Sequence, residues 1–327
     1  MGSGKTRKMA IRSKILSTGS YLPEKVLTNA DLEKMVDTSD EWIVQRTGIK
    51  QRHIAAEGQY TSDLAIAAAK QALERSGLDG GDIDAVIVAT ATPDKTFPAV
   101  AVKVQAAIGA SRGPAFDVEA ACSGFIYALG IADNFIKAGQ VKRIMLIGAE
   151  KISAAVDWTD RTTCVLFADG AGAVILEATE EEEGVISTHL HADGKYSEIL
   201  NTTGGPSTTG TIGHIYMEGR EVFKHAVTFL SEVVQETLEH NDIKPEELDW
   251  LIPHQANMRI IESTAKKLNM GMDRVVTTVD HHGNTSAASI PLALDEAVTD
   301  GRVKRGQLLL LEALGGGLTW GSALVRF

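Results

Sequence analysis

The segment Val118-Glu119-Ala120-Ala121-Cys122-Ser123-Gly124-Phe125 joins two different patterns of apolar residues. A strand-like run, Ala115 to Val118, comes before it, and a helix-like run, Ser123 to Ala138, follows. A helix that is apolar on nearly every side is typical of a domain centre. Unpaired N–H groups at its start lower the pKa of a nearby thiol. Cys122 is therefore expected to be a reactive thiol at the bottom of a pocket, unless it is a small core residue, as many free cysteines are.

Composition limits the class of protein. The chain has 327 residues, 44% of them hydrophobic and 23% charged, which fits two ordinary globular domains or one large one. Two cysteines are too few for a disulfide framework, and no run of about 18 apolar residues marks a membrane span. The net charge of −11 argues against broad nucleic-acid binding. We therefore expect a cytoplasmic protein with no membrane or nucleic-acid partner, preceded by a basic extension or expression remnant over residues 1–12.

The chain contains an internal duplication with an offset of 165 residues. A helix, a turn and a strand are predicted over 62–89 and again over 221–254, with Asp84 and Asp249 at matching positions. Strands that are apolar throughout alternate with helices, a pattern typical of mostly parallel sheets covered on both faces. The sequence therefore predicts two pseudo-symmetric α/β halves, residues 13–180 and 181–327.

The duplication indicates which polar side chains meet. Catalytic groups in such sheets lie at the carboxyl ends of strands. His254 follows a strand that ends at Pro253, and the offset aligns the segment Gly283-Asn284-Thr285-Ser286-Ala287 with the region of Cys122. We expect Cys122, His254 and Asn284 to converge. Such a set suits acyl transfer, because the sulfur can take an acyl group while the other two side chains stabilise a negative thioester oxygen.

Two further segments each allow two interpretations. The run Gly315-Gly316-Gly317-Leu318-Thr319-Trp320-Gly321 either lets the backbone approach a ligand, with one N–H completing an oxyanion hole, or forms a hairpin that needs glycines for its turn. Trp42 lies four residues before Arg46 and hence on the same helical face. The pair is either a stacking and charge site for a nucleotide or a core tryptophan beside a surface arginine.

No metal site is predicted. His189 and His191 face one side of a strand, but no carboxylate or cysteine accompanies them at ligand spacing. We expect the pair His281-His282 to support the asparagine loop, and Cys164 to be a core residue in a strand over 163–167. The segment Asp169-Gly170-Ala171-Gly172 is expected to be a turn between strands, because its glycines lack dinucleotide-binding spacing.

Four motifs resemble the β-ketoacyl-acyl-carrier-protein synthase III family: Ala121-Cys122-Ser123-Gly124, Pro253-His254-Gln255-Ala256-Asn257, Gly283-Asn284-Thr285-Ser286 and Gly315-Gly316-Gly317. The likeness runs from about residue 13 to residue 327. It implies an α/β thiolase-like fold, in which two pseudo-symmetric βαβαβαββ halves form a layered αβαβα core. It also implies a homodimer that catalyses the condensation starting type II fatty-acid synthesis, with no cofactor because acyl-CoA is a substrate.

The resemblance assigns roles to individual residues. Acetyl-CoA or another short acyl-CoA would acylate Cys122, and malonyl-acyl-carrier protein would then decarboxylate and attack the acyl-enzyme, giving acetoacetyl-acyl-carrier protein, CoA and CO2. His254 and Asn284 would stabilise the enolate, and the N–H groups of Cys122 and Gly316 the tetrahedral oxyanion. The remaining assignments are CoA binding by Trp42, Arg46, Arg161, Phe223 and Asn257, and a primer pocket closed by Leu314 and by Phe97 from across the dimer.

A basic helix face predicts where the acidic carrier protein docks. Arg259 and Lys266 are seven residues apart and so aligned, with Lys267 adjacent and Lys224 on a neighbouring helix. A solvated helix face is the alternative. Family members often have phenylalanine at the positions of Leu314 and Leu318, so the length and branching of the primer stay open.

Other classes of protein remain as alternatives. A degradative thiolase would need a second catalytic cysteine after Cys164, and elongating synthases have a histidine where this chain has Asn284. A type III polyketide synthase shares the Cys-His-Asn set. A hydrolase of the Cys-His-Asn protease kind and a non-enzymatic acyl-binding protein are the two remaining classes.

Overall fold

The computed structural model describes residues 11–110 and 113–327, and within them two central sheets have the same strand order. The first sheet is ordered β1 (Arg12–Tyr21), β7 (Gly170–Thr179), β6 (Arg143–Glu150), β4 (Ala85–Ala89) and β5 (Ala115–Val118). The second is ordered β8 (Gly184–Ala192), β13 (Thr319–Arg326), β12 (Leu308–Gly315) and β11 (Trp250–Pro253). The pair β4–β6 in the first sheet and the matching pair β11–β12 in the second are parallel, whereas β7 and β1, and likewise β13 and β8, pair antiparallel.

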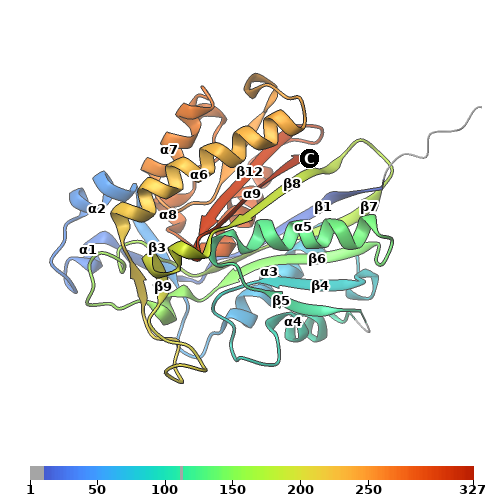
Figure 1. Ribbon diagram of the computed structural model, residues 1–327. Coiled ribbons are helices and arrows are strands. Elements are labelled where there is room, and N and C mark those ends of the chain that lie inside the picture. The colour runs from blue at the N-terminus through green and yellow to red at the C-terminus, as the bar shows by residue number, and fades with distance from the viewer. Residues whose placement is uncertain (1–10, 111–112) are drawn as a thin grey trace, which may run out of the picture.

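Helices cover both faces of both sheets, which produces five layers (Figure 1). Two helices, α5 (Gly124–Lys137) and α9 (Ser289–Thr299), lie between the sheets in one shared apolar core. The outer face of the first sheet is covered by α3 (Thr61–Ser76) and α4 (Val100–Ile108). The outer face of the second is covered by α6 (Gly219–His240) and α7 (Met258–Lys267). The αβαβα order predicted from the sequence is therefore confirmed.

The apolar pattern of each helix explains its layer. Helix α5 packs against strands of both sheets, and its side chains Phe125, Ile126 and Leu129 are fully enclosed. Helix α3 buries one stripe of mostly alanine, and these short side chains let it approach β1 closely. At Gly19 in β1, an added Cβ would lie 2.4 Å from the carbonyl oxygen of Ala68.

Several elements of the two halves begin at positions that differ by the same 165 residues. The 3-10 turns η2 (Ala121–Ser123) and η7 (Ser286–Ala288) are 165 residues apart, as are the starts of α5 and α9. Strands β6 and β12 have the same offset and the same length. The chain passes from one sheet to the other between Thr179 and Gly184.

Several sequence predictions need correction. The second half lacks a regular fifth strand, because only an isolated bridge joins Val275 to Leu251. Residues 163–166 form turns and Phe167 makes only an isolated bridge with Asn284, although Cys164 is fully buried as expected. Gly170 to Gly172 open β7 instead of making a turn. The predicted extension over residues 1–12 overlaps β1, which begins at Arg12; its first ten residues lie outside the described part.

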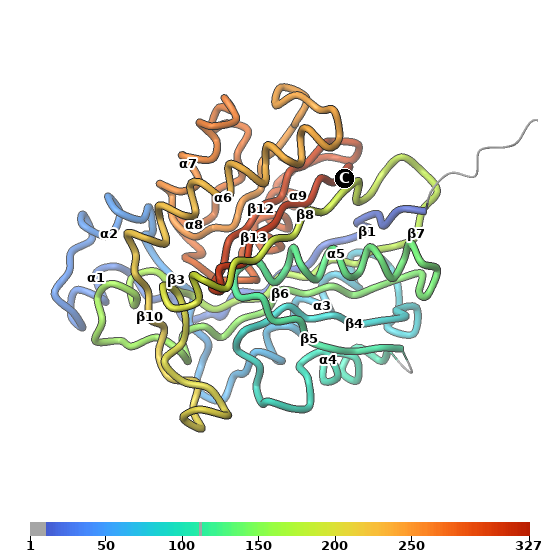
Figure 2. The backbone as a smooth tube through the Cα atoms, in the orientation of Figure 1, coloured from blue at the N-terminus to red at the C-terminus, as the bar shows by residue number. Residues whose placement is uncertain are grey.

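Smaller elements gather at one end of the molecule, as the backbone tube shows (Figure 2). They are β2 (Lys25–Thr28), β3 (Gln51–Ile54), α1 (Asn29–Leu32), α2 (Asp40–Thr47), α8 (Val279–His282) and the pair β9 (Leu200–Thr202) and β10 (Ile215–Met217). Across residues 11–110 and 113–327, none of the helices combines the length and apolar character needed to cross a membrane.

Candidate active site

A cavity of about 530 Å³ opens where the two halves meet, and Cys122, His254 and Asn284 all line it. Cys122 comes from the start of α5, His254 follows β11, and Asn284 precedes η7. The convergence predicted from the duplication is therefore found in the structure. Further lining groups are mostly apolar and come from the second half, including Leu200, Ile215, Met217, Val222, Ala226, Leu230 and Ile260.

Cys122 lies on a tightly constrained backbone. The preceding residue, Ala121, has a φ of 44°, a conformation that residues with a Cβ rarely adopt. The residue is partly open to the cavity but deep within the protein, and this burial raises the pKa of the thiol to about 11. The expected lowering of the pKa at the helix start is therefore wrong, because loss of hydration raises the pKa more than Ser286 lowers it.

His254 is held as a neutral imidazole with a defined orientation. Its burial lowers its pKa to about 3, so it is uncharged near neutral pH. Its Nδ1 is 2.6 Å from the hydroxyl oxygen of Ser289, which also accepts the N–H of Gln255. Among the described residues, Nδ1 is the only acceptor within hydrogen-bond distance of the Ser289 hydroxyl, so we infer that the hydroxyl hydrogen goes to Nδ1. The proton of the imidazole is then on Nε2, the nitrogen left to donate into the cavity.

A hydrogen bond also fixes the orientation of the Asn284 side chain. Its Oδ1 accepts the N–H of Ser286 at 2.9 Å, which leaves the Nδ2 hydrogens for a ligand. Its backbone is pinned on both sides, since its N–H donates to Leu166 O and its carbonyl accepts from Ala168 N, each at 2.9 Å. The two side chains together form a pair of preorganised donors.

The glycine run brings backbone directly to the cysteine. A Cβ at Gly315 would lie 2.6 Å from the amide nitrogen of Cys122, so only glycine fits there without a shift. Gly316 and Gly317 line the cavity in the turn between β12 and β13. Thr319 fastens this turn to the cysteine segment through its hydroxyl, which bonds Ser123 Oγ at 2.6 Å and Ala120 O at 3.1 Å. The run is thus both a hairpin and part of the site.

A buried carboxylate behind the cysteine was not predicted from the sequence. Glu150 ends β6 and is fully buried, and burial raises its pKa to about 7. Its carboxylate accepts hydrogen bonds from Thr92 Oγ1 at 2.5 Å and from Ala91 N at 3.2 Å. Ser286, which lines the cavity, lowers the pKa of both Glu150 and Cys122, although burial outweighs this effect in each. The signal in the sequence was a single acidic residue at the end of an otherwise apolar strand.

The side chains predicted to bind CoA fall into two groups. Phe223 and Asn257 line the cavity. Trp42, Arg46 and Arg161 lie outside it but are together: the guanidinium carbons of Arg46 and Arg161 are 4.9 Å and 5.6 Å from the Trp42 ring centroid. Asn257 links the groups, because its Nδ2 donates to Arg46 O at 3.1 Å while its Oδ1 caps the start of α7.

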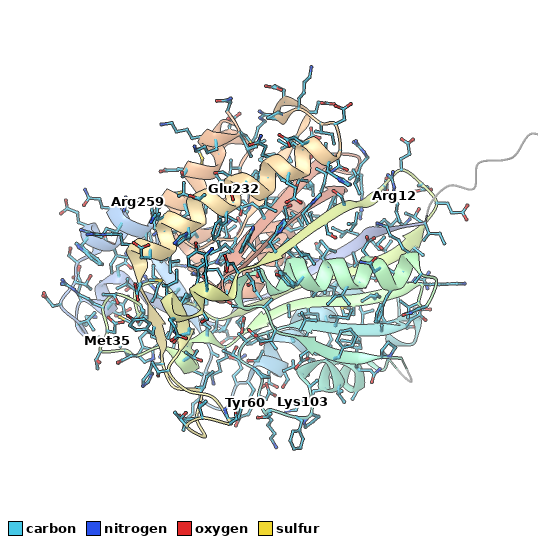
Figure 3. All side chains as sticks on the ribbon, viewed as in Figure 1. Arg12, Met35, Tyr60, Lys103, Glu232 and Arg259 are labelled. Carbon is cyan, nitrogen blue, oxygen red and sulfur yellow. The ribbon has the colours of Figure 1, made fainter. Side chains whose placement is uncertain are left out.

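The predicted docking residues are all exposed, and two of them, Arg259 and Lys224, are next to residues that line the cavity, whereas Lys266 and Lys267 lie at the other end of α7. The guanidinium of Arg259 packs over the ring of Phe223, with 5.1 Å between its carbon and the ring centroid. Figure 3 shows Arg259 at the end of the molecule far from Arg12. Lys224, Lys266 and Lys267 are also exposed, and Lys224 is 3.6 Å from the carboxylate of Glu221.

The two predicted primer-pocket residues differ in position. Leu314 lines the cavity and packs with Leu318, which is fully buried. Phe97 does not line the cavity of its own chain and is 81% exposed.

Two histidine clusters are joined by carboxylates. His189 and His191 contact different oxygens of Glu236, at 3.2 Å and 2.6 Å, a partner on α6 that sequence spacing did not reveal. His281 and His282 lie near Glu296 within 4.8 Å, close enough to hold a metal ion. Arg302 also binds the carboxylate of Glu296, at 3.0 Å. The positive guanidinium fits a set of ion pairs between α8 and α9 better than a metal site.

A thiolase-like fold with a cysteine, a histidine and an asparagine in one cavity defines the class of condensing enzymes, which are acyltransferases. Models of 3-oxoacyl-[acyl-carrier-protein] synthase III match residues 116–194, and models of its C-terminal part match residues 238–327. The β-ketoacyl-[acyl-carrier-protein] synthase III of Rhodospirillum centenum is 64% identical over 98% of this chain and 100% of its own length. That of Paramagnetospirillum magneticum is 63% identical over 97% and 100%.

A solved structure agrees with these sequence matches. The crystal structure of 3-oxoacyl-[acyl-carrier-protein] synthase III from Aquifex aeolicus VF5 has a TM-score of 0.93 and 53% identity, and covers 96% of this chain and 100% of that one. The chain belongs to the β-ketoacyl-acyl-carrier-protein synthase III family, the condensing enzymes that initiate type II fatty-acid synthesis.

Proposed function

We propose that this enzyme transfers a short acyl group from acetyl-CoA to Cys122 and condenses it with malonyl-acyl-carrier protein. The products are acetoacetyl-acyl-carrier protein, CoA and CO2. One observation carries the proposal: Cys122, His254 and Asn284 reach one cavity from two halves of the chain. The enzyme acts as a cytoplasmic homodimer and needs no cofactor, since CoA enters and leaves as part of the substrate.

The acyl-loading step uses backbone donors. The sulfur of Cys122 attacks the thioester carbon, and the oxygen gains negative charge. The N–H groups of Cys122 and Gly316 receive this oxygen, and the close approach of Gly315 to the cysteine backbone supports that role. Collapse of the tetrahedral intermediate expels the CoA thiolate and leaves the acyl group on sulfur.

The condensation step uses side-chain donors. Loss of CO2 from the malonyl group moves an electron pair toward the thioester carbonyl, whose oxygen becomes enolate-like. Nε2–H of His254 and Nδ2–H of Asn284 donate to that oxygen. Ser289 and the N–H of Ser286 orient the two donors in advance, so little reorganisation is needed when the charge develops. The carbanion then attacks the acyl group, and the sulfur of Cys122 leaves.

The remaining residues would contact CoA, the primer acyl chain and the carrier protein. Trp42 and Arg161 would flank the adenine, with Arg46 on the CoA phosphates and Phe223 and Asn257 along the path to the cavity. An inserted base has to displace the Arg161 guanidinium, which donates to Asp37 O at 2.8 Å. Leu314, with Phe97 from the second subunit, bounds the primer. Arg259, Lys224, Lys266 and Lys267 would receive the acidic carrier protein.

Radiolabelled acetyl-CoA tests the proposal. We expect a covalent label on the wild-type protein that survives denaturation and is released by thiols, and no label on Cys122→Ala. An unlabelled wild-type protein would favour the acyl-binding alternative. Condensation with malonyl-CoA alone, equal to that with malonyl-carrier protein, would favour the type III polyketide synthase.

A further inference from the structure

Asn284 can donate to an enolate only if its backbone is held in place, and residues 165–168 hold it. Its N–H donates to Leu166 O and its carbonyl accepts the N–H of Ala168, each at 2.9 Å, and Phe167 forms a parallel bridge with it. Residues 165–168 belong to neither central sheet. The position of the Asn284 carboxamide therefore depends on what fixes this segment from its other side.

Arg52 on β3 fixes the segment. Its side chain is fully buried, and its Nη2 donates to Val165 O at 2.7 Å. The same residue packs against the loop that carries Asn284, because a Cβ added at Gly283 would lie 3.1 Å from the Cβ of Arg52. Strand β3 also lies beside α8, the helix that leads into this loop (Figure 1). Arg52 thus touches both partners of the pairing between residues 165–168 and Asn284.

The guanidinium of Arg52 is not explained by an ion pair. In the described part of the chain its hydrogen bonds all go to uncharged oxygens, namely Val165 O, Asn29 Oδ1 at 2.7 Å and Leu27 O at 3.3 Å. Burial lowers its pKa to about 10, which leaves it protonated near neutral pH. An uncharged side chain would fill the same space with a smaller loss of hydration. The guanidinium is therefore better explained by the strong hydrogen bonds that it donates to these oxygens.

Asn29 holds the guanidinium from behind. Its buried side chain accepts from Arg52 through Oδ1, and its Nδ2 donates to Asp40 Oδ1 at 2.7 Å and to Ile49 O at 2.8 Å. Asp40 is the first residue of α2. A continuous chain of hydrogen bonds therefore runs from the start of α2 through Asn29 and Arg52 to Val165.

We propose that Arg52 is a positioning residue for the condensation step: its hydrogen bond to Val165 fixes residues 165–168, and these place the Asn284 carboxamide. Arg52 does not line the cavity, so it acts on the substrate only through Asn284. The proposal rests on the donor role that the proposed function gives to Asn284.

The acyl-loading step should depend much less on Arg52. The donors proposed for loading are the backbone N–H groups of Cys122 and Gly316, which lie on η2 and in the turn between β12 and β13. The hydrogen bonds of Arg52 reach neither element. Loss of the guanidinium should therefore impair CO2 release and spare acyl loading, whereas general damage to the fold would impair both.

Measuring the two steps separately in Arg52→Gln tests the proposal. The glutamine side chain is shorter and uncharged, so it loses the hydrogen bond to Val165. We expect CO2 release from malonyl-carrier protein to slow about tenfold, while loading of labelled acetyl groups stays within about twofold of the wild-type rate, because only the first step needs an exactly placed carboxamide. Arg52→Lys keeps the charge on a single donor group and should restore part of the loss.

A double variant separates positioning from a general structural role. In Asn284→Ala no carboxamide is left to place, so the addition of Arg52→Gln should slow CO2 release no further. Losses that multiply in the double variant would overturn the proposal. Equal losses in loading and in CO2 release in Arg52→Gln alone would do the same.

Arg305→Gln is the matched control. Arg305 also donates to backbone carbonyl groups, those of Ile15 and Leu16, but these belong to β1, which does not line the cavity. Both steps should run at wild-type rates in this variant. CO2 release in Arg52→Gln that is as fast as in the control would overturn the proposal.

Asn29→Ala is a second test that keeps Arg52 in place and decides the matter if the Arg52 variants do not fold. It removes one acceptor of the guanidinium, so CO2 release should slow about threefold with normal loading, the effect of one weakened hydrogen bond. Wild-type CO2 release in this variant would overturn the proposal. By contrast, CO2 release at the wild-type rate in Asn284→Ala would contradict the proposed function itself, whatever the Arg52 variants do.

Discussion

Ala121 and Ser286 occupy matching positions at the starts of α5 and α9, and both have a positive φ, 44° and 51°. The turns around them also match, yet their next residues differ: Cys122 in the first half and Ala287 in the second. One strained backbone thus presents a sulfur to the cavity, and its duplicate presents a hydroxyl to the same cavity. The comparison teaches that duplication supplied the geometry, while substitutions at a few positions divided the chemistry between the halves.

The ends of β6 and β12 also match in position but carry residues with different roles. Glu150 ends β6, and its side chain reaches the Ser286 turn. Gly315 ends β12 at the matching position, and its missing side chain lets backbone reach Cys122. Likewise His254 matches Ala89, which is fully buried. Cys122, Glu150 and His254 therefore each have a small or apolar counterpart in the other half, whereas Asn284 matches Glu119, which lines the same cavity.

Filling the space at Gly315 should have a larger effect than any change on the outer helices. In Gly315→Ala the new Cβ would lie 2.6 Å from the amide nitrogen of Cys122, and neither side is a flexible side chain. Displacing this oxyanion donor should slow acyl loading by about 100-fold or more, with a loss of about 1–3 kcal/mol in the free energy of unfolding. Rapid-quench loading and denaturant unfolding measure the two effects.

Gly81→Ala is the control for that substitution, because an added Cβ there meets nothing within 4 Å. It should load acetyl groups at the wild-type rate. Unchanged loading in Gly315→Ala would show that the match between the strand ends has no role in catalysis.

A smaller effect is expected on the KM for the carrier protein, and it should distinguish the outer helices of the second half from those of the first. In the second half α7 carries Arg259, Lys266 and Lys267, whereas its counterpart α4 carries only Lys103, which is paired with Asp94 at 2.7 Å. Arg259→Glu should raise the KM for malonyl-carrier protein about tenfold, since like charges at a docking surface weaken encounter. The KM for acetyl-CoA should change little.

Lys70→Glu on α3 provides the charge-matched control, because Lys70 is exposed on the outer helix of the other half. Its KM for the carrier substrate should stay near the wild-type value. Equal increases in both variants would indicate a response to net charge and would remove the docking surface from α7.

Much of the architecture could be predicted because it depends on regular patterns. The offset of 165 residues brought Cys122 and Asn284 together before any coordinates, and apolar strands and helices fixed the layers. Residues 163–167 were mistaken for a strand because a buried turn has the same apolar composition.

The electrostatics of the site were less predictable. The helix start at Cys122 suggested a low pKa, but burial raises it, and burial depends on residues far away in the sequence. Ser289 and Glu150 were missed because single hydroxyl or carboxyl groups form no motif. Their places follow only from contacts across 35 residues to His254 and across 58 residues to Thr92.

The central claim is that a sulfur from one half and two donors from the other perform separate steps in one cavity. Comparing His254→Ala and Asn284→Ala with the wild type, by labelled acetyl loading and by CO2 release from malonyl-carrier protein, tests it most directly. We expect both variants to load Cys122 at near wild-type rates and to release CO2 about 10²–10³-fold more slowly. Equal losses in the two steps, or unimpaired CO2 release, would contradict the account.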